Sequence, residues 1–172
     1  MQLKFNASLS YQINAVKSVI DLFSGQEIAQ RQFEISSGSI NTGVLFNEKA
    51  VSNNLTISDD DILKNLRKIQ YGNELPKSDK LSERSFSIEM ETGTGKTYIY
   101  LRSIFELNKN YGFQKFIIVV PGIVVREGVL NSIKSMSEHF KGLYNNVPFS
   151  SFIMTLLGLI TYGNLLLTIK FR

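Results

Sequence analysis

Cysteine is absent from this chain of 172 residues, and histidine occurs once, as His139. The lack of cysteine excludes a disulfide framework and a thiolate metal site. A single histidine argues against a zinc site and a Ser-His-Asp triad, so His139 is expected on the surface near the end of a helix. The N-terminus also lacks the apolar run of a secretory signal, which predicts a cytoplasmic protein.

Charged residues are missing from the segment Gly142–Ile169, although the chain carries 19 basic and 15 acidic side chains. The formal net charge of +4 would tolerate a nucleic-acid partner without requiring one. An apolar content of 43% is enough for the core of one ordinary domain. The loss of charge predicts that residues 150–172 form an apolar tail of different origin from the preceding chain.

Two interpretations of the tail 150–172 are open. A reading-frame change or truncation near Ser150 would explain the abrupt change of composition. A membrane segment is the alternative, because the charge-free stretch exceeds the roughly 20 residues that span a bilayer. Polar side chains within the apolar run raise the cost of insertion, and they are Ser150, Ser151, Thr155, Thr161, Asn164 and Thr168. They favour the frame change, and we expect no membrane association.

What the chain does contain is a glycine-rich turn, Met90–Thr97, with the sequence Met-Glu-Thr-Gly-Thr-Gly-Lys-Thr. The alternating stretch Ser85–Met90 before it predicts a strand, and the residues after it are compatible with a helix. Gly93 and Gly95 can adopt dihedrals that other residues avoid, so successive N–H groups can converge on phosphate oxygens. The turn is therefore predicted to bind phosphate; a surface turn with a solvated lysine is the alternative.

The residues at the end of this turn support a nucleotide site. Lys96 supplies a mobile positive charge for the β- and γ-phosphates, Thr97 offers a hydroxyl to Mg²⁺, and the following helix adds its positive dipole end. The strict motif has glycine where this chain has Met90, and the observed form is typical of helicase-type motors. The predicted cofactors are ATP and Mg²⁺, and the predicted ATP-binding residues of the loop are Thr92, Gly93, Thr94, Gly95, Lys96 and Thr97.

Hydrophobic spacing and capping signals predict three further helices. Residues 8–24 carry apolar side chains at helical spacing. Ser58 followed by Asp59–Asp61 is a helix-start signature, with a metal-binding acid cluster as the sharper alternative. A last helix is expected over residues 124–139, interrupted by Gly128.

A short apolar run, Phe116–Val120, predicts a buried parallel strand. Together with the strand before the glycine-rich turn and the helix after it, this run would complete a βαβ unit. Residues 30–54 predict loops with one or two short strands. The predicted fold class is α/β with a mostly parallel sheet.

Candidate binding residues also lie outside the glycine-rich turn. The amide of Gln12 can donate and accept hydrogen bonds, as contact with an adenine edge requires, and a solvated helix residue is the alternative. Arg126 and Glu127 fall in the first helical turn after Phe116–Val120, at the sheet edge where α/β proteins bind ligands. A solvated charge is the alternative for Arg126.

In the order of these segments the chain resembles the N-terminal part of the Res subunit of type III restriction endonucleases, which are superfamily 2 helicase-like motors. The resemblance rests on the segments Tyr11–Val16, Leu22–Gly25, Met90–Thr97, Ile117–Pro121 and Val125–Val129. It implies an incomplete RecA-like P-loop motor lobe. In that lobe residues 1–84 hold a glutamine motif and an insertion, residues 85–149 form the P-loop core, and the tail 150–172 lies outside the family.

The resemblance also implies a role for each matching position. Gln12 corresponds to the glutamine that contacts adenine, and the glycine-rich turn corresponds to motif I, which binds ATP and Mg²⁺. Pro121, Arg126, Glu127 and Gly128 fall where motif Ia touches the DNA backbone. In the family, ATP hydrolysis drives a change of state or movement on double-stranded DNA, a C-terminal nuclease domain cuts it, and a DNA-methylating Mod subunit recognises the site.

No apolar strand ending in an Asp-Glu pair follows the glycine-rich turn, so the acids of motif II are missing. No second lobe is present to supply an arginine finger. We therefore expect an N-terminal fragment that binds ATP but is catalytically incomplete, with unknown catalytic residues. The alternatives are a P-loop kinase or other nucleotide transferase, which would share Lys96 and Thr97, and a non-catalytic nucleotide-binding or membrane-associated remnant.

Overall fold

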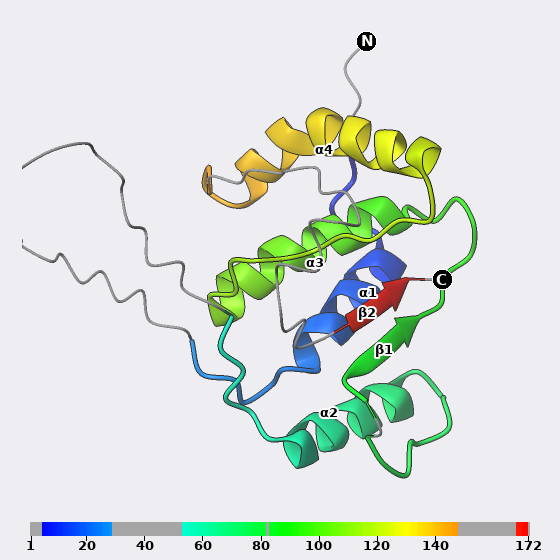
Figure 1. The fold of residues 1–172 in the computed structure, drawn as a ribbon, viewed down its shortest axis with the longest axis vertical. Helices are drawn as coiled ribbons and strands as arrows, with labels where there is room; N and C mark the ends of the chain where they lie inside the picture. Colours follow the sequence, from blue (N-terminus) through cyan, green and yellow to red (C-terminus); the bar gives the residue numbers. More distant parts are fainter. Residues whose placement is uncertain (1–4, 29–52, 82, 148–167, 172) are drawn as a thin grey trace, which may run out of the picture.

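The computed structural model describes residues 5–28, 53–81, 83–147 and 168–171 (Figure 1). Its described elements are the helices α1 (Ser10–Asp21), α2 (Asp59–Gly72), α3 (Lys96–Tyr111) and α4 (Ile123–Leu143) and the strands β1 (Ser85–Ile88) and β2 (Thr168–Phe171). Most of the predicted loop region 30–54 and of the tail 150–172 falls outside the described residues.

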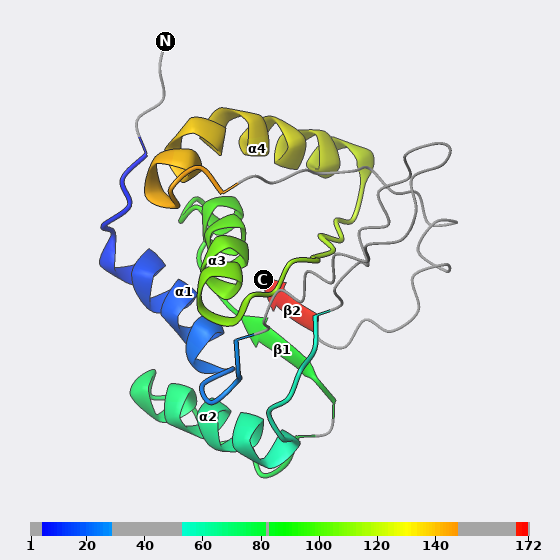
Figure 2. The same cartoon turned by 90° about the vertical axis from the view of Figure 1, so that its left-hand side faces the viewer.

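Helix α3 is the centre of the molecule, with α4 on one side and α1 on the other (Figures 1 and 2). Between α3 and α4 the rings of Phe105 and Phe140 stack with centroids 4.9 Å apart, and Phe105 and Tyr144 stack at 5.0 Å. A second cluster joins α1 to α2 and β1, and its most buried members are Phe23 and Ile62. Because Leu107 of α3 also belongs to the second cluster, apolar packing on both sides fixes the helix that follows the glycine-rich turn.

Local signals place the first two helices. The predicted helix over residues 8–24 is confirmed as α1, with shorter bounds. The start of α2 is capped by Ser58, whose hydroxyl oxygen accepts a hydrogen bond from the Asp61 amide at 3.2 Å. Asp59–Asp61 occupy the first turn, where their charges oppose the positive end of the helix dipole. Within the described ranges no group of three or more His, Cys, Asp or Glu side chains could hold a metal ion.

The two described strands pair in parallel, with Ser85 opposite Thr168 and Ile88 opposite Phe171. The strand predicted before the glycine-rich turn is thus confirmed as β1, although it ends before Met90. Its partner β2 comes from the tail, for which no strand was predicted. In the described part of the chain the sheet has two strands, so the predicted larger parallel sheet is not observed there.

The predicted strand Phe116–Val120 is wrong: the run has no regular secondary structure and no ladder partner among the described residues. Val119 is 75% exposed. The two residues directly before the run are held by Asn53, whose side-chain oxygen accepts hydrogen bonds from the backbone amides of Gln114 (2.8 Å) and Lys115 (3.1 Å). An apolar run becomes a buried strand only where neighbouring strands pair with it and cover it. The predicted βαβ unit is therefore absent from the described chain.

Helix α4 is continuous over Ile123–Leu143, so the predicted interruption at Gly128 is wrong. One glycine costs a helix only about 1 kcal/mol relative to alanine. The packing of Met136 and Phe140 against α3 offsets this cost. Among the described residues no helix is both long and apolar enough to cross a membrane.

Candidate functional site

The glycine-rich turn connects the end of β1 to the start of α3. Gly93 and Gly95 have φ angles of 83° and 87°, in the left-handed region that favours glycine. A Cβ atom on Gly95 would lie 2.7 Å from Nε2 of Gln12, which is closer than side chains tolerate. The two glycines therefore have the conformations that the motif predicts, and Gly95 in addition allows a close approach from α1.

Hydrogen bonds within the turn converge on the carbonyl oxygen of Glu91. It accepts from the Thr94 hydroxyl at 2.6 Å and from the Lys96 ammonium at 3.0 Å. Lys96 is the first residue of α3 and forms no ion pair in the described part of the chain. A phosphate oxygen would give this ammonium a stronger, charge-assisted partner than a neutral carbonyl. The turn thus holds its lysine close to the helix N-terminus without neutralising it.

The remaining loop positions frame the turn. Thr92 is exposed, and Thr97 is partly buried as the second residue of α3. The backbone amides in the first turn of an α-helix have no acceptor inside the helix and point out of its N-terminus. In α3 they therefore point toward the glycine-rich turn, where an anion could bind. The backbone of this region could hold a phosphate group, and Thr97 is the hydroxyl that the sequence predicts for a nucleotide-bound Mg²⁺.

Gln12 reaches the turn from α1 and is 6% exposed. Its Nε2 donates a hydrogen bond of 2.9 Å to the carbonyl oxygen of Thr94, which is 82 positions away in the sequence. The alternative of a solvated glutamine is therefore wrong. The structure brings Gln12 and the phosphate-loop candidates together at one place, as their predicted shared ligand requires.

The predicted DNA-contacting residues lie just before α4 and in its first turns. Pro121, Glu127 and Gly128 are exposed, and Arg126 is partly buried. The Arg126 guanidinium pairs with Glu127 of the same helix, with Nη2 to Oε1 at 2.9 Å and Nε to Oε1 at 3.2 Å. The positive charge of Arg126 is therefore paired within α4. In Figure 1 the start of α4 and the start of α3 face the same side of the molecule.

Comparison with known proteins decides the family. The family model described as "Type III restriction enzyme, res subunit" matches residues 7–149. The chain belongs to the type III restriction enzyme Res subunit family. The chain corresponds to the N-terminal part of a Res subunit, as the order of its segments predicted.

Three curated Res subunits show the extent of the similarity. The Res subunit of EcoP15I from Escherichia coli is 40% identical over 95 residues, which are 52% of this chain and 10% of that protein. The Res subunit of EcoPI from Escherichia phage P1 is 32% identical over 145 residues, or 81% of this chain and 14% of the relative. The Res subunit of StyLTI from Salmonella typhimurium is 42% identical over 78 residues, or 44% and 8%. The chain thus spans a small part of the length of these relatives.

One contact in this Res-family chain was missed by the sequence analysis. His139, predicted at the surface, is partly buried, with Nε2 3.0 Å from the hydroxyl of Tyr98. Burial, and next to it the charge of Arg102, lower the pKa of His139, while burial raises the pKa of Tyr98. Tyr98 follows Lys96 by two positions, so this bond ties the first turn of α3 to α4. The position of His139 on the inner face of its helix, one residue before Phe140, was the available signal.

Proposed function

We propose that this chain is the ATP- and Mg²⁺-binding N-terminal part of a Res-subunit motor. On this proposal residues 1–84 carry the glutamine motif with an insertion, residues 85–149 form the P-loop core of an incomplete RecA-like lobe with a mostly parallel sheet, and residues 150–172 are an added tail. The observation that carries the proposal is the loop of two left-handed glycines at the N-terminus of α3, with Gln12 hydrogen-bonded to it.

Each loop residue has a proposed task that follows from its chemistry. The backbone amides from Thr92 to Gly95 surround the phosphate oxygens. Lys96 would exchange the Glu91 carbonyl for the β- and γ-phosphates, and Thr97 would hold Mg²⁺ together with the nucleotide. ATP supplies the phosphoryl group and Mg²⁺ the charge that neutralises it when both are bound.

Gln12 is the proposed contact to adenine. Its Nε2 already donates to Thr94, whereas its Oε1 accepts no hydrogen bond from the described residues. This amide oxygen would gain a partner when the exocyclic amine of adenine donates to it. The side chain that contacts adenine would thus be the same one that is hydrogen-bonded to the phosphate loop.

The exposed start of α4 is the proposed motif Ia contact to double-stranded DNA. For Arg126 to reach a phosphate, its guanidinium must leave the carboxylate of Glu127. An exposed pair of this kind contributes only about 0–1 kcal/mol, so the exchange costs little. Apart from the backbone of α4 itself, no described atom lies within 4 Å of a Cβ built at Gly128, so this position does not obstruct the approach.

The proposal extends to the complete protein. A full-length Res subunit would act in the cytoplasm as a DNA-dependent ATPase and endonuclease with a DNA-methylating Mod subunit. The motif II acids that hydrolysis requires do not follow the loop in this sequence. We therefore propose binding of ATP with very slow turnover.

The test is ATP binding by calorimetry for the chain and for Lys96→Ala. Loss of the charge-assisted contacts should weaken binding at least about tenfold, since each is worth roughly 1.5–3 kcal/mol. Lys109→Ala is the matched control, because Lys109 is exposed near the other end of the same helix. Equal affinity of the chain and Lys96→Ala would refute the phosphate-loop assignment, and phosphate transfer to an acceptor would favour a kinase.

A further inference from the structure

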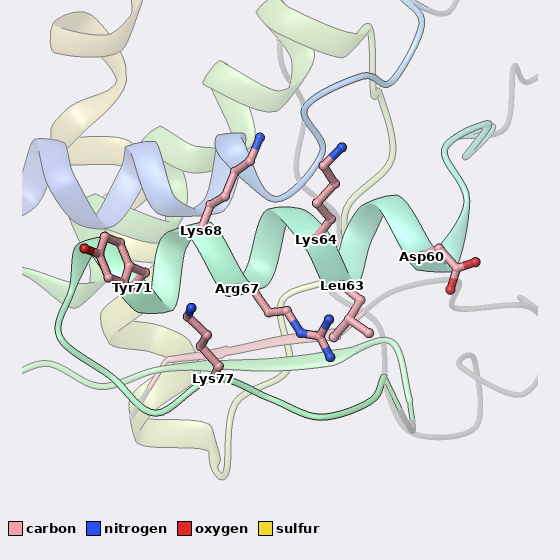
Figure 3. Close-up of a pocket in the computed structure, with 7 residues that line it drawn as sticks. All are labelled: Asp60, Leu63, Lys64, Arg67, Lys68, Tyr71 and Lys77. Carbon is pink, nitrogen blue, oxygen red and sulfur yellow. The ribbon is translucent and has the colours of Figure 1, made fainter.

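The outer face of α2 carries a basic surface that neither the proposed ATP site nor the start of α4 uses. It surrounds a shallow hollow of about 530 Å³, shown in Figure 3. The residues that line this hollow are Asp60, Leu63, Lys64, Arg67, Lys68, Tyr71 and Lys77. We call this set the α2 face. It lies at the opposite end of the molecule from α4 in both overall views (Figures 1 and 2).

Helical spacing puts the basic residues that α2 itself contributes to this face on one side of the helix. Lys64 and Lys68 are four positions apart and are therefore neighbours on the helix surface. The opposite side of α2 is fixed in the core by Ile62, which is fully buried, and by Asn65, whose Nδ2 donates to the Ser24 carbonyl at 2.8 Å. The basic side therefore faces solvent in a defined orientation.

The loop after α2 is folded back to complete the face. Arg67 donates from Nε to the Ser78 carbonyl at 2.8 Å and from Nη2 to the Asp79 carbonyl at 2.7 Å. Gln70 exchanges two hydrogen bonds with Ser78, one to its hydroxyl and one from its amide. These bonds hold Lys77 beside α2, with its Nζ 5.3 Å from the ring centre of Tyr71.

The charge of the face is not neutralised within the described chain. Lys64, Lys68 and Lys77 are exposed and belong to none of its ion pairs. Of the acids at the start of α2, Asp59 pairs with Arg84 at 2.8 Å and Asp61 accepts from the Ser58 hydroxyl at 2.7 Å. Among the lining residues, Asp60 alone is acidic. The face thus presents a net positive charge to a partner.

We propose that the α2 face binds the phosphate backbone of double-stranded DNA without regard to sequence. Lysine, arginine and tyrosine side chains are among the groups that contact DNA phosphates and sugars. Tyr71 is 74% exposed, and Figure 3 shows its ring at the end of the face nearest Lys77. DNA as the partner rests on the proposed function, but the contact is separate from the start of α4 and needs no ATP.

The experiment measures binding of the whole chain to a fluorescent DNA duplex of 20 base pairs, by anisotropy, without ATP and over a series of salt concentrations. Lys64→Glu/Lys68→Glu should weaken binding about tenfold or more at low salt. Each lost phosphate contact should also reduce the slope of log affinity against log salt by about 0.9. The matched control is Lys17→Glu/Lys109→Glu, which changes the net charge equally at exposed lysines of α1 and α3.

Three results would overturn the proposal. The control variant could lose as much affinity as the α2 variant, which would make the effect one of net charge. The wild-type chain could fail to bind the duplex at low salt. Polyglutamate could displace the chain from the duplex as well as unlabelled DNA does, which would indicate an acidic protein partner. Thermal unfolding of each variant checks folding, and ATP binding measured in parallel distinguishes failure here from failure of the phosphate loop.

Discussion

At the scale of single residues, Gly95 leaves room for Gln12 of α1 to contact the phosphate loop. Its φ angle of 87° disfavours a side chain, and an added Cβ would displace Nε2 of Gln12. For Gly95→Ala we expect the free energy of unfolding to fall by about 1–2 kcal/mol, because alanine is strained in the left-handed conformation. Displacement of Gln12 from Thr94 should add about 1 kcal/mol for the lost hydrogen bond. Urea unfolding gives the free energy of unfolding for this comparison.

Gly128 provides the matched control for this substitution. It lies inside α4, and apart from the backbone of that helix no described atom lies within 4 Å of an added Cβ. Gly128→Ala should stabilise the chain by up to about 1 kcal/mol, because alanine is the better helix former. If Gly95→Ala and Gly128→Ala changed the free energy of unfolding in the same direction, the destabilisation expected for Gly95→Ala could not be attributed to its φ angle and its contact with Gln12.

At the scale of elements, α2 shows how far local signals determine structure. Its N-terminus is specified by Ser58 and the acids after it, with the hydroxyl of Ser58 bonded to the Asp61 amide. Ser58→Ala should cost about 1 kcal/mol, the usual contribution of such a cap. The expected loss is measurable as a lower urea midpoint with an unchanged slope. Ser10→Ala is the control, since the start of α1 has no side-chain cap, and an equal loss there would contradict the capping argument.

The elements that the sequence predicted poorly are those that depend on distant partners. The conformations of Gly93 and Gly95 could be predicted because they follow from residue type. The run Phe116–Val120 has strand composition, but in the described chain nothing pairs with it, and composition cannot supply a neighbour. The contact of Gln12 with Thr94 was likewise invisible, because it joins positions 82 residues apart.

At the scale of the whole molecule, β2 tests whether the tail contributes to the fold. Its parallel pairing with β1 protects one edge of the strand that leads into the phosphate loop. Deletion of residues 168–172 removes a pairing of four residues, Thr168–Phe171. With each hydrogen bond worth about 0.5–1.5 kcal/mol net, the free energy of unfolding should fall by roughly 1–3 kcal/mol.

The free energy of unfolding and amide hydrogen exchange together show whether the deletion acts on β1 alone or on the whole fold. Amide hydrogen exchange should accelerate in Ser85–Ile88, the residues that face β2, more than in α4, because loss of a ladder exposes its own backbone groups first. Removal of Arg172 alone is the control, since it leaves all four paired residues of β2 in place. Unchanged stability and unchanged exchange in β1 would mean that the tail pairs too weakly to support the loop. Faster amide exchange in β1 together with weaker ATP binding would make β2 a structural support of the phosphate site.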